Sequence, residues 1–334
     1  MDEWMLRNLA CPRDKGSLEF RDDLLTCQAG HAYSVIDGIP VLILEDDHPT
    51  HGYLQQSLEQ VKRVRAGEEL SAVLRQVRSD DDIDGFVKGE LPYTNGTLYF
   101  PVQKRLTRYP LPDLRLPASN GERLLDVGCN WGRWTIRAAQ KGYYAIGIDP
   151  SLDAVMAARR VSRQLGVHAQ FVVGDARYLP FADSAFDVVY SYSVLQHFSK
   201  ANARSALAEM NRVLKESGKV LVQMANKLGV RSFQQQWRRG FTEGEAFEVR
   251  YWRPTELIKT FDELFGKTKI SADCYFGLGV QGSDADLMPL KYRMVIYASE
   301  ALRRISKSFM PLVNVADSVF LESIKNNGPH NVSK

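Results

Sequence analysis

The sequence predicts an α/β protein: a Rossmann-like, doubly wound sheet of seven strands, preceded by a small β-rich module and an α-helical connector. Apolar runs with strand character alternate with helical patterns from Glu122 onward, which is typical of parallel βαβ units. A glycine-containing loop at 128–132 lies where the first of these strands turns into a helix. Residues 1–46 are short runs broken by turn residues, which indicates short strands.

The elements of the predicted sheet follow from local patterns. Apolar β runs place strands at 123–127, 144–148, 171–173, 186–191 and 219–224. Helices are expected at 132–140 and 151–165, ended by Gly142 and Gly166, and at a stretch where Ala203, Leu207, Met210 and Leu214 share one face. After a helix at 255–265, the β-like runs 269–275 and 316–323 are expected to form an antiparallel edge, with a partly helical insertion at 286–308.

Compositional shifts divide the chain into five parts. We expect a β-rich module at 1–46, a helical connector at 47–118, and a cofactor-binding core at 119–225. The connector is polar, with a helix expected through 54–77 and a proline-rich stretch after it. Residues 226–325 are expected to complete the sheet and to carry insertions that cover the substrate, and 326–334 to be a disordered tail.

Composition and charge exclude several classes of protein. The 334 residues contain 43 Lys and Arg against 40 Asp and Glu, a net charge of +3 that gives no polyanion-binding signature. With 44% hydrophobic and 25% charged residues, the chain is neither disordered nor collagen-like. The longest strongly apolar stretch, 39–44, is far shorter than the roughly 20 residues of a membrane span. The acidic start and four scattered cysteines lead us to expect a cytoplasmic protein.

The glycine loop indicates the kind of ligand. A dinucleotide fingerprint that starts at Gly128 requires glycine at 130 and 133, where the sequence has Asn130 and Arg133. The loop fits an acid-x-Gly-x-x-x-Gly pattern instead, made by Asp126, Gly128 and Gly132.

Two further acids stand at the ends of the next strands. Asp149 follows Gly128 by 21 positions, close to the spacing of roughly 20 at which a second-strand acid reaches ribose hydroxyls. Asp175 closes the third strand. Three strand-end acids in register with a glycine loop predict a nucleotide-like ligand.

These motifs resemble the class I methyltransferases that use S-adenosylmethionine, in particular the small-molecule type of ubiquinone and menaquinone biosynthesis, over residues 122–224. The resemblance implies that Gly128 and Gly132 approach the methionine end of the cofactor, that Asp149 binds its ribose, and that Asp175 and Ala176 face its adenine. Asn130 stands where glycine is common, and asparagine tolerates the left-handed conformation. The expected cofactor site is completed by Asp126, Asn130, Pro150 and Ser191.

The first module has its own resemblance. Its pattern Cys11-Pro12-x-Asp14, Cys27-x-x-x-His31 and Asp37-Gly38-Ile39-Pro40 is similar to a zinc-ribbon-like domain that activates RNA and protein methyltransferases and is also fused to methyltransferase chains. Zinc accepts Cys, His and Asp ligands, so the resemblance implies a tetrahedral site of Cys11, Asp14, Cys27 and His31. Because the first pair lacks its second cysteine, we favour the alternative of a metal-free module that hydrophobic contacts hold together.

Catalysis and acceptor binding are assigned to residues outside the glycine loop. His197, just after the fourth core strand, is the candidate general base, the alternative being that it only positions its loop. Aromatic and basic residues interleave over 237–253, which makes Trp237, Arg250 and Tyr251 candidate substrate ligands; the alternative is a solvated loop whose tryptophans dock on the core.

The expected function is therefore methyl transfer from S-adenosylmethionine, with S-adenosylhomocysteine as product, to an oxygen of a small molecule such as a saccharide, glycolipid or secondary-metabolite intermediate. An RNA methyltransferase is the first alternative, because Lys62, Arg63 and Arg65 form a modest basic patch and Arg238 and Arg239 another. A partner protein that binds the cofactor without catalysis is the second. Homo-oligomer formation is left open.

Overall fold

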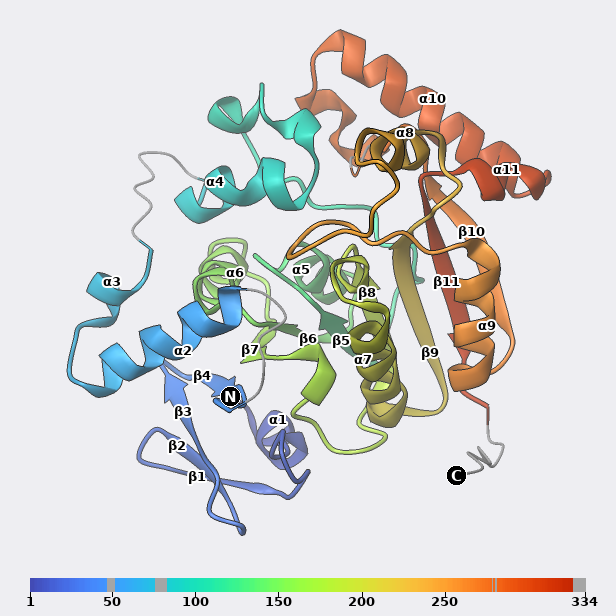
Figure 1. Cartoon of the computed structure of the whole chain (residues 1–334). Coiled ribbons are helices and arrows are strands. Elements are labelled where there is room, and N and C mark those ends of the chain that lie inside the picture. The colour runs from blue at the N-terminus through green and yellow to red at the C-terminus, as the bar shows by residue number, and fades with distance from the viewer. Residues whose placement is uncertain (47–51, 76–82, 278, 280, 327–334) are drawn as a thin grey trace.

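A computed structural model describes residues 1–46, 52–75, 83–277, 279 and 281–326. Its strands form one 11-stranded sheet in the order β1-β2-β3-β4-β7-β6-β5-β8-β9-β11-β10 (Figure 1). The strands are β1 (Leu18–Arg21), β2 (Leu24–Cys27), β3 (Ala32–Ile36), β4 (Ile39–Leu42), β5 (Arg123–Val127), β6 (Tyr144–Asp149), β7 (Gln170–Gly174), β8 (Phe186–Tyr192), β9 (Leu214–Ala225), β10 (Thr268–Cys274) and β11 (Ser318–Ile324).

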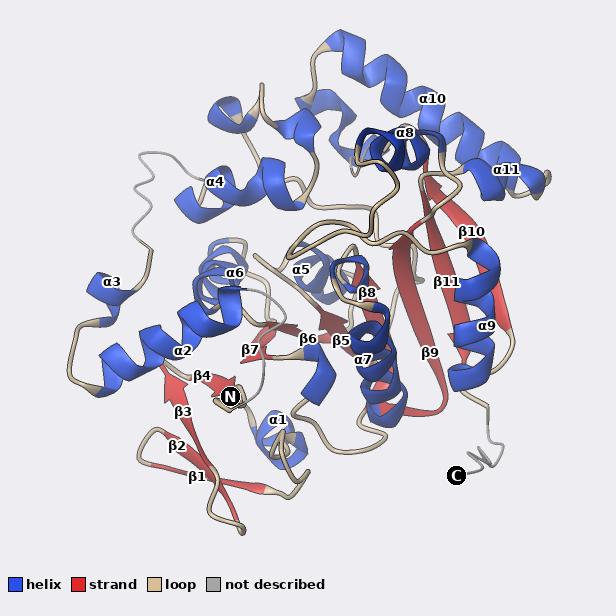
Figure 2. Ribbon diagram, viewed as in Figure 1, coloured by secondary structure: helices blue, strands red, loops and turns tan. Residues whose placement is uncertain are grey.

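Helices flank this sheet (Figure 2). They are α1 (Glu3–Asn8), α2 (Gly52–Arg65), α3 (Leu70–Val73), α4 (Gly85–Thr94), α5 (Arg133–Gln140), α6 (Leu152–Gln164), α7 (Lys200–Val213), α8 (Val230–Arg238), α9 (Pro254–Phe265), α10 (Leu290–Ser306) and α11 (Pro311–Val315). Short 3₁₀ turns are η1 (Thr97–Tyr99), η2 (Gln103–Arg105), η3 (Ala176–Tyr178), η4 (Leu195–His197) and η5 (Gly282–Leu287). None of these helices is both long enough and apolar enough to span a membrane.

The seven strands β5 to β11 are those that the sequence predicts. Strands β7, β6, β5, β8 and β9 run parallel, and β11 lies antiparallel between β9 and β10. The central strands are buried on both faces, as their nearly continuous apolar sequences require. The predicted antiparallel edge is confirmed, for instance by the pairing of Thr268 with Ser323.

Three apolar cores lie against the sheet, and the smallest contains Trp134 of α5 and Phe320 of β11. One contains Leu207 of α7 and Phe261 of α9, together with Met5 and Leu9 of the first module. Another contains Val155 of α6 and Phe86 of α4. The connector helices therefore pack on the core domain and cover part of it.

The first module is continuous with the central sheet. β4 pairs in parallel with β7, through Val41 with Val173 and Leu42 with Gly174. A second joint follows α1, where Leu9 forms an antiparallel bridge with Phe181. The division at residue 46 that composition suggests is therefore no boundary in the hydrogen-bonded sheet.

The predicted connector helix differs from the observed one. α2 ends at Arg65 because Gly67 adopts a φ of +94°, a conformation that glycine takes without strain. The chain resumes as the short α3, and positions 76 and 77 of the expected helix lie outside the described residues. The expected disordered tail also lies outside them, apart from Asn326.

Candidate functional site

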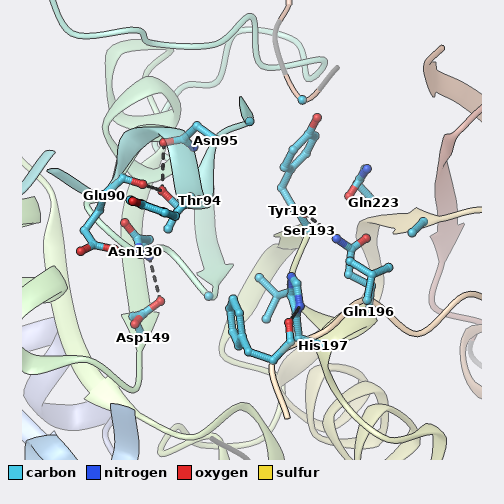
Figure 3. A pocket seen from close by; sticks show the side chains of 18 of the residues that line it. Glu90, Thr94, Asn95, Asn130, Asp149, Tyr192, Ser193, Gln196, His197 and Gln223 are labelled. Carbon is cyan, nitrogen blue, oxygen red and sulfur yellow. Dashed lines mark hydrogen bonds between the residues drawn. The ribbon is translucent and has the colours of Figure 1, made fainter. Parts of the chain in front are cut away.

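A cavity of about 840 Å³ lies at the carboxyl ends of the parallel strands, the edge at which open α/β sheets bind ligands (Figure 3). Three parts of the chain form its wall. The core contributes Gly128, Asn130, Asp149, Asp175, Ser193 and His197, the connector Tyr53, Glu90, Thr94 and Asn95, and the segment after β9 Arg231, Gln235, Arg239 and Tyr251.

The glycine loop after β5 forms one side of the cavity. Gly128 has a φ of +80°, and a Cβ atom there would lie 2.2 Å from Cγ2 of Val194, so both the conformation and the space require glycine. Asn130 has a φ of +47°, the left-handed conformation that its sequence position predicts. The loop thus brings bare backbone to the cavity.

Asp149 is held in place by this loop. Its carboxylate accepts a hydrogen bond from the backbone N–H of Asn130 at 2.9 Å (Figure 3). It accepts a second from the backbone N–H of Ser151 at 3.0 Å. Burial raises the pKa of Asp149 to about 6, although the two backbone donors act in the opposite direction. A fixed carboxylate at the end of the second core strand can accept hydrogen bonds from a pair of ligand hydroxyls. Pro150, which follows it, also lines the cavity.

Asp175 and Ala176 line the cavity next to Asp149, as expected. The Asp175 carboxylate is engaged by its own neighbour, because it forms an ion pair of 2.6 Å with Arg177 and accepts a bond from the Arg177 backbone N–H. Arg177 therefore fixes the orientation of the Asp175 carboxylate.

Three of the expected cofactor residues do not line the cavity. Asp126 is fully buried beneath it and accepts a 2.6 Å bond from the Thr135 hydroxyl; burial raises its pKa to about 7. Gly132 faces the core, where an added Cβ would lie 3.0 Å from Ala158 and from the Phe171 ring. Ser191 donates to the Val127 carbonyl at 2.9 Å. All three support the loop from behind, which corrects their expected contact with ligand.

His197 lines the cavity from η4, opposite Asn130 and Asp149 (Figure 3). Its Nδ1 lies 2.7 Å from the Phe247 carbonyl, and its ring stacks on the Phe247 ring at 4.1 Å. A carbonyl only accepts, so Nδ1 carries the proton of the neutral ring and Nε2 is the basic nitrogen.

The structure separates the three expected substrate residues. Tyr251 lines the cavity, whereas Trp237 and Arg250 do not. Arg250 fastens the loop from inside, donating to the His197 carbonyl at 2.7 Å while its backbone N–H donates to the Gln196 carbonyl at 2.7 Å. Trp237 is 70% exposed and does not dock on the core, whereas Trp252 of the same segment is 1% exposed and packs in the apolar core beside Phe261, as the alternative expects. Because Trp237 does not line the cavity, its expected contact with substrate has no support from this geometry.

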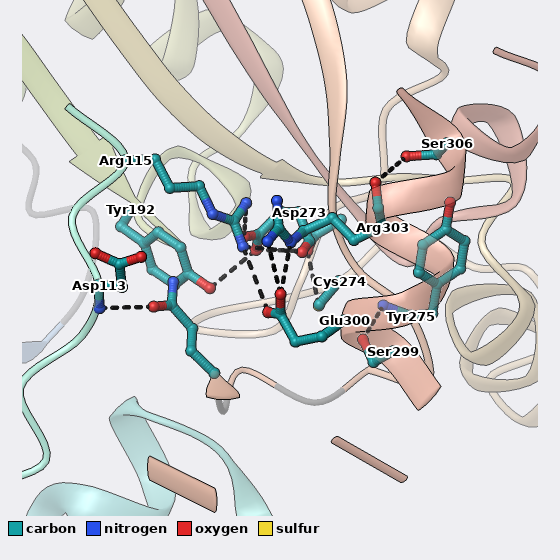
Figure 4. A network of polar contacts seen from close by, with 12 residues as sticks. Asp113, Arg115, Tyr192, Asp273, Cys274, Tyr275, Ser299, Glu300, Arg303 and Ser306 are labelled. Carbon is teal, nitrogen blue, oxygen red and sulfur yellow. Dashed lines mark hydrogen bonds and ion pairs between the residues drawn. The ribbon is translucent and has the colours of Figure 1, made fainter. Parts of the chain in front are cut away.

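A buried polar network fixes a wall residue that sequence reasoning missed (Figure 4). The Tyr192 hydroxyl donates to Asp273 at 2.9 Å, and Arg115 of the connector forms an ion pair of 2.8 Å with the same carboxylate. Burial and the nearby Asp273 charge raise the pKa of Tyr192, so it remains a neutral phenol. The three partners come from segments far apart in the chain, so no local sequence motif predicts their contact.

Arg133 is a second residue that the sequence analysis passed over. It is the first residue of α5, lines the cavity and is 3% exposed. Its guanidinium lies 3.6 Å from Asp284, but within the described residues its nitrogen atoms have no hydrogen-bond partner. A buried cation with unused donors suits an anionic group of a ligand.

The four candidate metal ligands of the first module converge. One donor atom from each of Cys11, Asp14, Cys27 and His31 lies within 4.8 Å of the others. His31 Nδ1 is 3.5 Å from Cys11 Sγ, 3.3 Å from Cys27 Sγ and 3.0 Å from Asp14 Oδ2. Around a tetrahedral zinc ion such pairs lie roughly 3.3–3.6 Å apart, as bond lengths near 2.0–2.3 Å dictate. The donor set therefore fits zinc.

Known proteins resemble the part of the chain that forms the cofactor side of the cavity. Residues 124–218 match the protein family described as "Methyltransferase domain". An uncharacterized methyltransferase of Synechocystis sp. is 33% identical over 122 residues, 36% of this chain and 55% of that protein. An O-methyltransferase of Penicillium expansum is 37% identical over 128 residues, 36% of this chain and 44% of that protein.

The chain therefore matches about half the length of these curated relatives. A solved structure of phosphoethanolamine N-methyltransferase 2 from Haemonchus contortus, in complex with S-adenosyl-L-methionine, has a TM-score of 0.45 and 17% identity. That alignment covers 74% of this chain and 58% of the other. The segment 124–218 that matches the methyltransferase domain family contains the glycine loop, Asp149 and Asp175.

Proposed function

We propose that this protein uses S-adenosylmethionine to methylate an oxygen atom of a small molecule, a saccharide, glycolipid or secondary-metabolite intermediate, in the manner of ubiquinone and menaquinone biosynthesis enzymes. The observation that carries the proposal is the Asp149 carboxylate, fixed by two backbone donors beside the glycine loop and facing a cavity that continues into the connector. One side can hold the cofactor and the other side its acceptor. The family match over 124–218 supports the cofactor, and the O-methylating relative supports oxygen as the acceptor atom.

Each cofactor-facing residue has a distinct role in this proposal. Asp149 accepts hydrogen bonds from the ribose hydroxyls, Gly128 lets the methionine end approach the backbone, and Asp175 with Ala176 borders the adenine. Arg133 binds the methionine carboxylate with donors that the protein itself does not use. The cofactor supplies a sulfonium-activated methyl group, so alignment of donor and acceptor accounts for most of the catalysis.

His197 acts as general base. As the acceptor oxygen forms its bond to the methyl carbon, the carbon–sulfur bond breaks, its electron pair stays on sulfur, and the hydroxyl proton passes to His197 Nε2. The Phe247 carbonyl keeps the proton on Nδ1, which leaves Nε2 basic. In single-turnover assays we expect His197→Ala to lower the methyl-transfer rate roughly 10²-fold or more. A rate within about threefold of the wild type, at unchanged cofactor affinity, would remove this role.

Transfer of labelled methyl from S-adenosylmethionine tests the reaction. The protein is offered a small-molecule and glycolipid extract and, separately, unmodified total RNA. We expect label in the extract, lost in Asp149→Ala and retained in Asp183→Ala, which changes an exposed carboxylate away from the cavity. Label in RNA alone would contradict a small-molecule acceptor. No label in either pool, together with no thermal stabilisation by S-adenosylmethionine, would contradict the proposed cofactor.

We also propose that Cys11, Asp14, Cys27 and His31 hold a structural zinc ion, because their donor atoms converge within 4.8 Å and His31 Nδ1 lies at 3.3 and 3.5 Å from the two sulfur atoms. This reverses the metal-free interpretation favoured from sequence. Metal analysis of chelator-free protein should find about one zinc per chain, and Cys27→Ala should lose it. Zinc below about a tenth of an equivalent would exclude the site.

A further inference from the structure

Helix α8 is oriented opposite to an ordinary surface helix. Its buried residues are the polar Ser232 and Gln236, whereas Val230, Phe233 and Trp237 are 62%, 50% and 70% exposed. The three apolar residues recur at i, i+3 and i+7, so they share one face of the helix. An amphipathic helix normally turns this face toward the core.

Polar contacts fix this orientation. The Ser232 backbone N–H donates to Asp317 Oδ1 at 2.8 Å, and its hydroxyl donates to the Asp317 carbonyl at 3.2 Å. Gln236 Nε2 donates to the Lys227 carbonyl at 2.8 Å. Turning the apolar face inward would break all three bonds and leave the buried Asp317 without the two donors of Ser232. The apolar face is therefore held outward by the fold.

The exposed face extends beyond both ends of the helix. Leu228 and Phe241 are 48% and 56% exposed, and the Phe241 and Phe233 rings contact at 5.5 Å. We call these side chains the α8 patch: Leu228, Val230, Phe233, Trp237 and Phe241. Single exposed apolar residues are common on proteins, but five large ones within 14 residues mark an interaction surface.

The same segment is basic. Residues 227–241 contain Lys227, Arg231, Arg238 and Arg239 and no acidic residue. Arg239 lies 3.4 Å from Glu248, while Lys227, Arg231 and Arg238 form no ion pair with another residue that the structure describes. Exposed Phe and Trp side chains with neighbouring Lys and Arg are the composition of helices that lie in the interface of an anionic membrane.

Charge also indicates whether a membrane or a second copy of this chain covers the α8 patch. In a twofold dimer the same patch would face itself and bring these basic residues together. Anionic headgroups complement them. We therefore propose that the α8 patch docks on an anionic lipid surface.

This surface borders the cavity. The cavity wall includes Arg231, Gln235 and Arg238 of α8. Docking through the α8 patch would therefore place this wall of the cavity at the lipid surface. If the proposed function holds, the acceptor is an amphiphile taken from that surface, which selects the glycolipid class among the acceptors above. This step rests on the proposed function, but the docking itself does not.

Cosedimentation of the full chain with vesicles tests the docking. We expect binding to vesicles of equal parts phosphatidylcholine and phosphatidylglycerol, and much weaker binding to phosphatidylcholine alone. Trp237→Ser should lower the partition coefficient roughly tenfold or more, as expected for loss of a large buried apolar side chain. Lys227→Gln should lower it about fivefold at low salt. Phe20→Ser, which changes an exposed aromatic of β1 in the first module, should leave it unchanged.

Two results would overturn the proposal: no binding of the wild type to anionic vesicles, or binding that Trp237→Ser leaves intact. A dimer in size-exclusion chromatography that Trp237→Ser dissociates, without vesicle binding, would show that a second copy covers the patch. Thermal stabilisation by S-adenosylmethionine, measured on the same samples, reports on the proposed function separately. Trp237 does not line the cavity, so Trp237→Ser should preserve that stabilisation.

Discussion

At the scale of single residues, the three strand-end acids show how identical side chains acquire different roles. Asp149 faces the cavity with two backbone donors behind it, Asp175 is paired with Arg177, and Asp126 lies below the cavity on Thr135. Their spacing along the sequence predicts that they gather at one edge of the sheet. It does not predict which carboxylate faces the ligand, because that depends on how deeply each strand end is buried.

The raised pKa of Asp149 predicts a pH dependence of cofactor binding. A carboxylate accepts bonds from both ribose hydroxyls, whereas the protonated acid has lost part of that capacity. Because the pKa of Asp149 in the protein without cofactor is about 6, the affinity for S-adenosylmethionine should fall by up to about tenfold per pH unit below pH 6. Calorimetric titration between pH 5 and pH 8 measures this effect. Asp149→Asn should bind weakly at every pH, and an equally steep profile in that variant would assign the titration elsewhere.

Stability without cofactor should change in the opposite sense. The folded pKa of Asp149 lies above its ordinary value of 3.8, so the folded protein holds this proton more tightly than the unfolded chain. Its contribution to stability is fully present below about pH 4 and is lost as pH rises through 6.

Arg133 should distinguish between two ligands that share the same nucleoside. S-adenosylhomocysteine carries the amino-acid carboxylate, and 5′-methylthioadenosine lacks it. Arg133→Met should therefore weaken S-adenosylhomocysteine by about 1.5–3 kcal/mol, the usual value of a hydrogen bond to a charged group, and leave 5′-methylthioadenosine within about threefold. Equal losses for both ligands in calorimetry would mean that Arg133 only supports the fold through Asp284.

At the scale of elements, strands are predicted better than loops. The apolar runs predict the ends of strands β5 to β8 to within about two residues. Strands that are buried on both faces need nearly continuous apolar sequences, which are easy to recognise. The end of α2 is missed, since Gly67 stops the helix inside an otherwise helical pattern. Arg250 and Trp237 do not line the cavity, because interleaved aromatic and basic residues do not reveal which side chains turn inward.

Glycine substitutions in the loop between β5 and α5 and in the first module separate two costs in stability: that of a positive φ and that of a steric clash. Gly128→Ala places a residue at φ +80° and a methyl group 2.2 Å from Val194, and should cost about 2–4 kcal/mol of unfolding free energy. Gly30→Ala meets a φ of +86° but no atom within 4 Å, so it should cost only about 1–2 kcal/mol. Denaturant titration compares them. Adding Val194→Ala to Gly128→Ala should recover the part of the unfolding free energy that the steric clash costs. Equal losses of unfolding free energy in Gly128→Ala and Gly30→Ala would rule out the contact with Val194.

At the scale of the whole molecule, the first module and the core form one sheet. The sequence separates them at residue 46 because composition changes there, but pairing between β4 and β7 joins segments more than 120 positions apart, and no local pattern records it. The backbone of 8–10 also pairs with that of 180–182, through Ala10 to the Pro180 carbonyl at 3.0 Å and Ala182 to the Asn8 carbonyl at 2.9 Å. A module attached in this way should not unfold independently.

Leu9→Ala tests this unity in scanning calorimetry. Leu9 is 1% exposed and lies in one apolar core with Phe181 and Phe186, so its truncation should cost about 2–5 kcal/mol and lower the melting temperature of the whole protein as one transition. Leu24→Ala, in the same module but 37% exposed, should change stability by less than about 0.5 kcal/mol. If Leu9→Ala instead splits the transition, with a module that melts early and a core that melts as in the wild type, the shared sheet does not make the two parts cooperative. A single shifted transition would mean that the zinc ion proposed at Cys11, Asp14, Cys27 and His31 would, when bound, also stabilise the folded cofactor site, although the two sites share no residue.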